Sequence, residues 1–444
     1  MAQICDHQVG SPTPSESPHH CLLQTKKWVK KYFWEGQKLA EKAQEVSPDA
    51  PWHVRHRRAI AMFTPAIIFH LAWWTFMGIT DNFYLFNDRA GEGGVPRWYM
   101  TLTMLFGSMI AGATSEGGAS VAFPVMTLAF GIAPAIARDF SFMIQSFGMT
   151  AAGFTILVMR VQIEYNSLIF TSLGGLIGII LGLEYVAPSL TPAYSKMYFV
   201  VIWFAFAFSL YQLNRLYGRK VYMKIPNWED GVLIRCGPVS LNWKAVVLFA
   251  FGILGGIFSA MSGSGIDICS FACLTLLFRV SEKVATPTSV LLMAGNTCIG
   301  FLYREFGMGG AEPESYKYLL VCIPIVVLGA PLGSMVGSHF HRLVLASFVY
   351  VTDTVQLIGA LAIVRPWSTL KTDTPMHLSL TSLVIVVSGG IFFRLLAFAG
   401  EKLLETQEKL PSQNFEEAKD IQEEEDQYCS APASDLEKIG SNDC

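Results

Sequence analysis

The stretch GATSEGGASVAFP, residues 112–124, decides the fold together with a second stretch of the same kind, SAMSGSGIDICSF, residues 259–271. Each interrupts a long apolar region, 98–132 and 245–278 respectively, with glycine, serine and one carboxylate. Each region is too long for one membrane crossing, which takes about 20 residues. We therefore expect two shorter helices in each region, meeting at a break. Because lipid cannot satisfy free backbone N–H and C=O groups, such a break should line a cavity inside the protein.

Eight further apolar segments run without interruption, and each approaches the length of a membrane span. Of the 444 residues, 52% are apolar and only 15% are charged, whereas a soluble domain carries roughly 25% charged residues. The predicted fold class is therefore all-α, a polytopic transmembrane helical bundle. The eight segments are Ala59–Ile79, Phe140–Met159, Leu168–Val186, Tyr198–Leu216, Ala285–Tyr303, Tyr316–Val336, Leu343–Val364 and His377–Phe398.

Composition also limits the partners and cofactors of the chain. A net charge of −3 provides no basic field for nucleic acid, so the lipid bilayer is the expected macroscopic partner. The nine cysteines include no CxxC pair, and neither a disulfide framework nor a metal site is expected. The ATP-binding sequence GxxxxGK[ST] does not occur, so we expect no direct use of ATP and no cofactor.

The basic residues set the expected orientation. Arg55, Arg57 and Arg58 precede the first span, and further Lys and Arg residues follow Leu213. Placing both groups in the cytoplasm satisfies the positive-inside rule, and an even number of crossings then makes both termini cytoplasmic. The plasma membrane is the default location. Segment 22–46 mixes Lys with Trp, Tyr and Phe, which fits a helix at the membrane surface or, alternatively, a solvated basic helix.

Hydropathy and charge divide the chain into seven regions. The last is acidic and poor in aromatic residues, which predicts a disordered cytoplasmic tail. In order, the regions are a polar N-terminal region (1–58), a leading span with its loop (59–97), a first transmembrane repeat (98–216), a basic cytoplasmic loop (217–244), a second transmembrane repeat (245–364), a final span (365–400) and the acidic tail (401–444).

The repeat rests on segments that recur in the same order after each break. AIARDFS at 135–141 pairs with KVATPTS at 283–289, and LGGLIGIILG at 173–182 pairs with LGAPLGSMVG at 328–337. Glycines four residues apart lie on one helix face and let another backbone approach closely. Generic helix packing would explain one such triplet, whereas recurrence in both halves indicates duplication. Three full spans between the breaks predict that the repeats are inverted, which places a substrate site near the bilayer midplane. Half-helix N-termini there would suit an anion.

Taken together, the two breaks, the segments APAIARDFS and EKVATPTS, and the glycine triplets resemble the TauE/SafE family of sulfite exporter-like membrane proteins, over about residues 101–359. The resemblance implies an inverted-repeat fold and secondary-active export of small sulfur-containing anions such as sulfite or organosulfonates, without enzymatic activity. The chain departs from the family in its long polar N-terminus, its leading span, its acidic tail, and the carboxylates Glu116 and Asp267 in the breaks.

Candidate anion contacts are backbone N–H groups freed by glycine and hydroxyl donors of serine. Those at the breaks are Ser115, Gly117, Gly118, Ser120, Ser262, Gly263, Ser264 and Gly265. Those on the adjacent helices are Ser141, Gln145, Ser289, Asn296 and Thr297. For each polar residue inside a span, the alternative is helix packing, worth about 0.6 kcal/mol.

Glu116 and Asp267 carry the ion-coupling hypothesis. A charge at membrane depth costs roughly 2.5–3.5 kcal/mol on insertion scales, so such residues face a cavity or a partner. Proton coupling is one reading, and a carboxylate that caps freed N–H groups is the other, with equal weight.

Basic residues flank these elements: Arg138, Arg279, Lys283 and Arg304. They would attract anions to the entrances or serve as interfacial anchors. Two other functions stay open at this point. A non-transporting scaffold or receptor would use the polar tails, and an intramembrane enzyme would need a constellation of catalytic residues that the spans do not offer.

Overall fold

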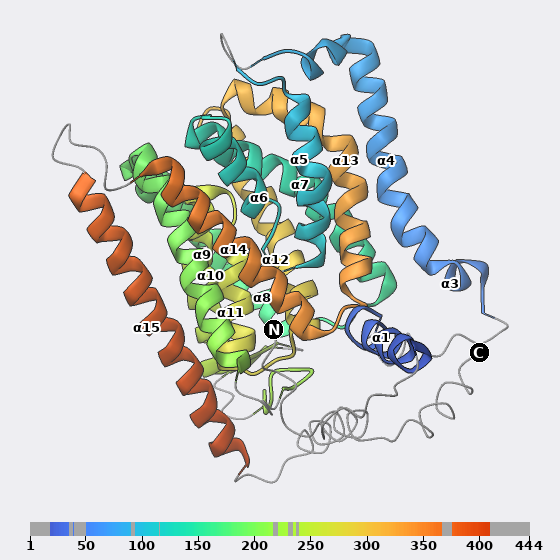
Figure 1. Ribbon diagram of the computed structural model, residues 1–444, viewed down its shortest axis with the longest axis vertical. Coiled ribbons are helices and arrows are strands. Elements are labelled where there is room, and N and C mark those ends of the chain that lie inside the picture. The colour runs from blue at the N-terminus through green and yellow to red at the C-terminus, as the bar shows by residue number, and fades with distance from the viewer. Residues whose placement is uncertain are drawn as a thin grey trace.

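A computed structural model describes most of the chain. The described residues are 18–34, 39, 50–89, 94–114, 116–215, 221–229, 234–236, 239–365 and 375–408. Nearly all of them are helical, as Figure 1 shows. The predicted all-α class is confirmed except for one small antiparallel hairpin in the basic loop, built from β1 (Ile234–Cys236) and β2 (Val239–Leu241).

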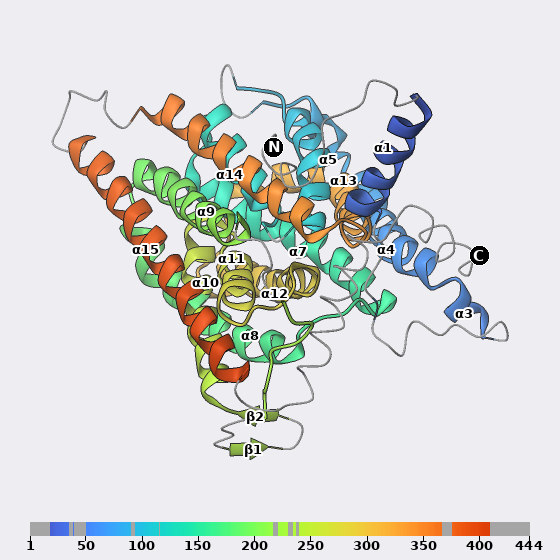
Figure 2. The same cartoon turned by 60° about the horizontal axis from the view of Figure 1, so that its bottom comes forward.

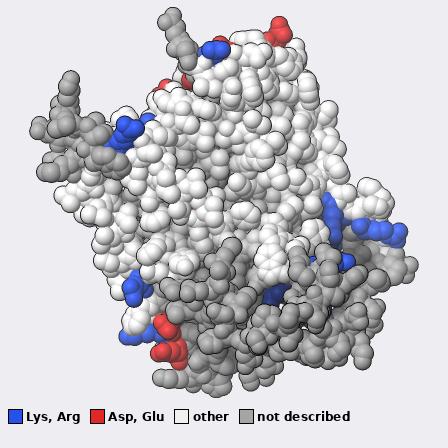
Figure 3. Space-filling model, viewed as in Figure 1, with Lys and Arg blue, Asp and Glu red and all other residues white. Residues whose placement is uncertain are grey.

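Nine helices in the described part of the chain are long and apolar enough to cross a membrane. Eight correspond to the predicted uninterrupted spans, and the ninth, α10, opens the second broken region. On the face in Figure 3, the charged side chains lie toward the two ends, and the surface between them is almost uncharged. The protein is thus an integral, multi-pass membrane protein. The nine are α4 (Arg57–Thr80), α7 (Pro134–Met159), α8 (Tyr165–Leu181) continued by η3 (Gly182–Val186) and η4 (Ala187–Ser189), α9 (Pro192–Arg215), α10 (Trp243–Ser262), α12 (Glu282–Leu302) continued by η6 (Tyr303–Gly307), α13 (Pro313–Gly337), α14 (Arg342–Val364) and α15 (Pro375–Glu408).

Both predicted breaks are present, and each is followed by a short helix that continues as a π-helical turn. After α5 (Trp98–Ala113) the chain resumes in α6 (Ala119–Pro124) and η2 (Val125–Ala129). After α10 it resumes in α11 (Ile266–Ala272) and η5 (Cys273–Leu277).

Glycine explains why the helices stop where they do. Gly117 in the first break has a φ of +72°, and Gly263 in the second has a φ of +88°. L-residues with a Cβ rarely adopt this left-handed region, whereas glycine enters it without a steric penalty. The glycine-rich composition that marked the breaks therefore corresponds to a real backbone requirement.

The order of elements after the breaks recurs along the chain. η2 begins at Val125 and η5 at Cys273, 148 residues later, and α7 begins at Pro134 and α12 at Glu282, again 148 residues later. Each half then continues with two long helices, α8 and α9 in the first and α13 and α14 in the second. Residues 148 apart in α7 and α12 are called equivalent below.

Helices of the two halves pack closely against each other at glycines. α8 packs along α10, and α13 packs along α5. A Cβ on Gly256 of α10 would lie 2.5 Å from the carbonyl oxygen of Gly175 on α8, and a Cβ on Gly112 of α5 would overlap the carbonyl of Ala330 on α13. The same contact is thus made twice with the halves exchanged, and only small residues permit backbones to approach this closely.

α7 and α12 form the centre of the bundle and run antiparallel. The start of α7 meets η6 after the end of α12, where Arg304 contacts Asp139. The end of α7 meets the start of α12, where Ile156 and Thr286 line one cavity. α4 and α15 lie on opposite flanks in Figure 1, α4 against α7 and α13, and α15 against α9 and η5.

The shorter elements lie at the ends of the bundle. They are α1 (Pro18–Phe33), α3 (Trp52–Arg55) and η1 (Asn82–Phe86). α1 covers the first part of the expected interfacial helix at 22–46, most of whose remainder lies outside the described residues. The N–H of His341 donates to the carbonyl of Tyr32 at 2.9 Å, so the end of α1 lies beside the link between α13 and α14, as Figure 2 also shows. α15 runs eight residues past the expected end of the final span.

Candidate functional site

The two breaks meet in the middle of the bundle, between α7 and α12. A Cβ on Gly117 would lie 2.7 Å from Oε1 of Gln145 on α7 and 3.0 Å from Oδ2 of Asp267 on α11, and it would overlap the sulfur of Met293 on α12. The lack of a side chain at Gly117 therefore lets the first break contact the second. Gln145 and Met293 occupy equivalent positions, since 145 plus 148 is 293.

Gln145 fastens the second break to α7. Its Nε2 donates to the carbonyl of Ser141 at 3.0 Å and to the carbonyl of Gly263 at 2.8 Å. Because both partners are acceptors, the amide orientation is fixed by chemistry. Its Oε1 is buried and receives no hydrogen bond. The side chain thus presents an unpaired acceptor toward Gly117 and Asp267.

Asp267 is the second residue of α11 rather than a residue of the break itself. Its side chain is fully buried, Oδ2 accepts a hydrogen bond from Oγ of Ser264, and Oδ1 has no hydrogen-bond partner. A carboxylate in the first turn of a helix interacts favourably with the free N–H groups there. Asp267 therefore lies where a carboxylate can interact with free N–H groups, and both interpretations of it stay open.

Glu116 lies in the first break, fully buried, and faces α14. Thr352 on α14 places its Oγ1 2.8 Å from Oε1 and 2.7 Å from Oε2 of Glu116. The next residue, Asp353, is also fully buried and lies beside the carboxyl groups of Glu116 and Asp267, and no N–H or hydroxyl donor among the described residues reaches its oxygens. Sequence reasoning did not single out Thr352 or Asp353. The signal was a lone carboxylate in the middle of an otherwise apolar span.

Three buried carboxyl groups thus lie near one another at the centre. No ion pair among the described residues reaches Glu116, Asp267 or Asp353. In the part of the chain that the structure describes, no three His, Cys, Asp or Glu side chains are placed to hold a metal ion. Burying unpaired charges of one sign is costly, and like charges nearby raise that cost.

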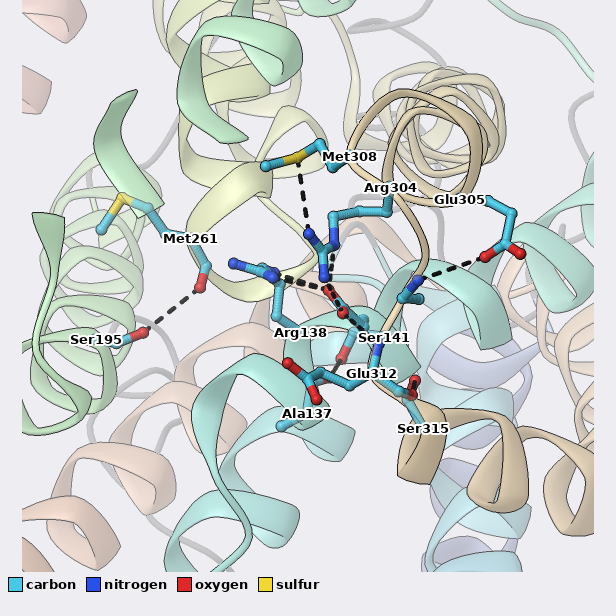
Figure 4. A network of polar contacts seen from close by, with 12 residues as sticks. Ala137, Arg138, Ser141, Ser195, Met261, Arg304, Glu305, Met308, Glu312 and Ser315 are labelled. Carbon is cyan, nitrogen blue, oxygen red and sulfur yellow. Dashed lines mark hydrogen bonds and ion pairs between the residues drawn. The ribbon is translucent and has the colours of Figure 1, made fainter. Parts of the chain in front are cut away.

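One end of the bundle, here called the Asp139 end, is held by ion pairs (Figure 4). Asp139 is fully buried, and its Oδ1 accepts from Nε and Nη2 of Arg138 at 3.0 and 2.9 Å. Nε and Nη2 of Arg304 donate to Oδ1 and Oδ2 of Asp139 at 3.1 and 2.9 Å, and the N–H of Glu312 donates to Oδ2 at 3.0 Å. Such bidentate, charge-assisted contacts are among the strongest in proteins. They join the start of α7 to the segment that follows α12.

At the opposite end, here called the Thr286 end, the residues equivalent to Arg138 and Asp139 line a cavity. The cavity measures about 30 Å³ and lies among Ile156, Lys283, Thr286 and Pro287, with Gly112 of α5 on one side. A cavity of this size has room for a water molecule. Lys283 is one of the basic residues that flank the repeats, and it lines this cavity.

The other residues predicted to contact the anion differ in the interactions that they make in the structure. Gly118 and Gly265 cap α6 and α11. Asn296 is buried and faces α8, with Oδ1 3.0 Å from the position of a Cβ on Gly175. Arg279 donates to the carbonyl of Ala397 on α15 at 3.0 Å. Ser115 lies outside the described residues. Four hydroxyls donate to nearby carbonyls of their own segment: Ser120 to Gly117, Ser262 to Ser264, Ser289 to Thr286 and Thr297 to Met293.

Comparison with known proteins identifies the family. A family model described as Sulfite exporter TauE/SafE matches residues 100–356, more than half of the chain. The matched range begins in α5 and ends in α14, so it contains both breaks, both glycine triplets and the three central carboxyl groups. No curated protein and no solved structure matches the chain. The protein therefore belongs to the sulfite exporter TauE/SafE family of membrane anion transporters.

Proposed function

We propose that the protein is a secondary-active transporter of small sulfur-containing anions such as sulfite or organosulfonates. The observation that carries the proposal is the meeting of the two breaks, where Gly117 contacts Gln145 and Asp267. A site built from interrupted helices of two related halves is the arrangement that alternating-access transporters use at the bilayer midplane. The family description points to export, and the direction of net flux would follow the driving gradients.

The proposal includes two inverted repeats, 98–216 and 245–364, whose broken helices re-enter the membrane from opposite sides. At the second break, the ring of Trp243, which begins α10, lies 6.1 Å from the ring of Phe278, which follows η5. At the first, Val95 before α5 and Phe130 after η2 line one cavity. Both pairs support hairpins that return to the side from which they start.

We place the Thr286 end, together with both termini, in the cytoplasm, with the plasma membrane as the default location. The N–H of Tyr222 donates to the carbonyl of Arg279 at 2.8 Å, and the N–H of Ser281 donates to the carbonyl of Tyr222 at 2.8 Å. These bonds hold the basic loop after α9 beside the start of α12. The positive-inside rule favours a cytoplasmic position for that loop.

A flux assay with two glycine variants tests the function. Purified protein in vesicles should exchange radiolabelled sulfite and taurine across the membrane. In Gly117→Ala the new methyl would overlap Met293 and strain the backbone, so we expect exchange to fall by about tenfold or more, the effect of roughly 1.4 kcal/mol. Gly131→Ala is the matched control, because Gly131 also has a positive φ, +68°, but has open space around its Cβ position.

The alternatives predict different outcomes in the same vesicles. Anion binding without exchange in the unmodified protein would favour a receptor or scaffold. Conversion of the labelled compound would favour an enzyme. Equal losses in Gly117→Ala and Gly131→Ala would show that backbone strain alone impairs the protein and would remove the central site from the explanation.

A further inference from the structure

Several buried hydrogen-bond acceptors at the centre of the bundle receive no donor, and the buried Nδ2 of Asn296 on α12 is likewise without an acceptor. Oε1 of Gln145, Oδ1 of Asp267 and both carboxyl oxygens of Asp353 are buried and receive no hydrogen bond. The amide of Gln145 cannot rotate to supply a donor, because its Nε2 already serves the carbonyls of Ser141 and Gly263. Buried acceptors are nearly always paired in folded proteins, so these four atoms indicate a missing donor.

The charged groups of the neighbouring elements do not supply that donor. On α7, Asp139 binds Arg138 and Arg304 at one end of the bundle, six residues or about 9 Å of helix from Gln145. On α12, Glu282 and Lys283 lie at the start of the helix, about 15 Å of helix before Met293. On α9, Nζ of Lys196 donates to the carbonyl of Thr127 at 2.8 Å. On α11, the charged residue is Asp267. On α14, the charged residues are Asp353 and Arg342, which begins the helix about 16 Å of helix before Asp353.

A proton is the ligand that corrects this shortage most simply. A protonated carboxyl group is a donor, whereas an ionised one only accepts. A proton on Asp353 or Glu116 would let the two neighbouring carboxyls hydrogen-bond to each other. A proton on Asp267 would provide a donor beside Oε1 of Gln145. Each protonation also removes one of the like charges that burial penalises.

An anionic substrate would also require hydrogen-bond donors at this site. Sulfite and organosulfonates carry oxygen acceptors and negative charge, so three ionised carboxyls at the site would repel them. Protonated carboxyls would remove the repulsion and offer donors to the substrate oxygens. Proton binding and anion binding at this centre should therefore favour each other, and by linkage the effect is reciprocal.

We propose that Asp353 forms a proton-binding cluster with Glu116 and Asp267, and that protons and the anion cross the membrane together as a symport. The inference rests on the proposed transport function and adds its coupling ion and a coupling residue on α14. Thr352 is the positioning residue of the cluster, because its hydroxyl contacts both oxygens of Glu116.

The test measures proton and anion movement in the same vesicles, with the membrane potential clamped. Sulfite itself titrates near neutral pH, so a labelled organosulfonate of fixed charge, isethionate, is the better probe. In the unmodified protein, isethionate should accumulate on the alkaline side and should carry protons with it, reported by an entrapped pH dye. Accumulation on the acidic side would indicate antiport and would overturn the proposal without any variant.

Variants then assign the coupling to Asp353. Asp353→Asn should lose the proton movement per isethionate transported, and Asp353→Glu, which keeps a carboxyl group, should restore it. Asp81→Asn is the control, since Asp81 is exposed at the end of α4. Unchanged proton movement in Asp353→Asn would overturn the role of that residue. Should Asp353→Asn fold poorly, Glu116→Gln takes its place, because it also removes one carboxyl group from the cluster, and unchanged proton movement per isethionate in that variant would contradict the proposal.

Two further outcomes separate this inference from the proposed function. Isethionate exchange without any proton movement, or accumulation driven by a sodium gradient, would overturn proton coupling and leave transport intact. Absence of isethionate, sulfite and taurine exchange in the unmodified protein would overturn the transport function itself.

Discussion

The Asp139 end and the Thr286 end occupy equivalent positions in the two halves, yet their chemistry differs completely. Arg138 and Asp139 correspond to Thr286 and Pro287, each 148 residues later, and Arg304 corresponds to Ile156, 148 residues earlier. Ion pairs occupy these positions at the first end, whereas the corresponding threonine, proline and isoleucine at the second line a small cavity that Lys283 also lines. The close contact of α8 with α10 has a counterpart in that of α13 with α5, whereas the side chains at the two ends have no such counterpart. The contacts that the two halves share are therefore those between the long helices, and the side chains at each end are specific to that end.

The largest expected effect comes from removing the carboxylate at the Asp139 end. Asp139→Asn would leave two guanidinium groups, each only 12–13% exposed, without their counter-charge. Loss of one partner from a buried ion pair costs roughly 3–5 kcal/mol. We expect a loss of that size in SDS-induced unfolding from mixed micelles. A loss no larger than that of Asp81→Asn would mean that the ion pairs do not hold this end.

A smaller loss of stability, similar in both halves, is expected at the glycines where helices of the two halves pack closely. Gly112→Ala and Gly256→Ala each place a methyl against a backbone carbonyl of the partner helix. Overpacking of this kind costs about 1–3 kcal/mol, and both variants should lose similar stability in the same unfolding assay. Gly295→Ala on α12 is the control, because nothing lies within 4 Å of its Cβ position. Very different losses at the two sites would contradict equivalent packing.

The smallest effects concern one acid outside the membrane at each end, and they have opposite signs. The hydrogen bond from Arg97 lowers the pKa of Asp88 near the Asp139 end. Burial raises the pKa of Glu164 near the Thr286 end, although hydrogen bonds from the N–H groups of Ile225 and Asn166 oppose the change. Asp88 therefore adds stability above its ordinary pKa of 3.8 and loses it as pH falls through the folded value. Glu164 adds stability below its ordinary pKa of 4.5 and loses it as pH rises through the folded value.

The corresponding measurement is the unfolding free energy against pH. Asp88→Asn should lose less than about 1 kcal/mol at neutral pH, because the Asp88 side chain is 41% exposed and Arg97 keeps its ion pair with Glu314, and it should converge with the unmodified protein in acid. Glu164→Gln should weaken the decline of stability as pH rises from acid to neutral. Curves that shift in the same direction for both variants would show that the two ends do not differ in this respect.

Features that depend on nearby residues were predictable from the sequence. Hydropathy along a span is local, so the eight uninterrupted spans were confirmed as helices. Glycine-rich composition is also local, and both breaks are present where it predicted them. Several bounds differ by a few residues. α7 begins at Pro134 and α9 at Pro192, each six residues before the expected start, because proline suits the first turn of a helix, and α15 continues to Glu408.

Contacts between distant residues were not predictable in the same way. Thr352 and Glu116 are 236 residues apart, and Arg304 and Asp139 are 165 apart. A single carboxylate such as Asp353 forms no motif with its sequence neighbours, so its partner became apparent only when α14 was placed beside the first break. Conversely, Gln145 was a candidate because it is a polar residue in the span that follows the first break.

The pairing of α5 with α13 and of α8 with α10 has a mechanical consequence. In each pair, a helix from one half touches the backbone of a helix from the other so closely that a single methyl group does not fit. The two halves of the sequence therefore cannot move apart as rigid bodies unless these backbone contacts are first broken. A large rearrangement of the bundle would therefore move α5 together with α13, and α8 together with α10. Each moving unit would combine helices from both halves of the chain.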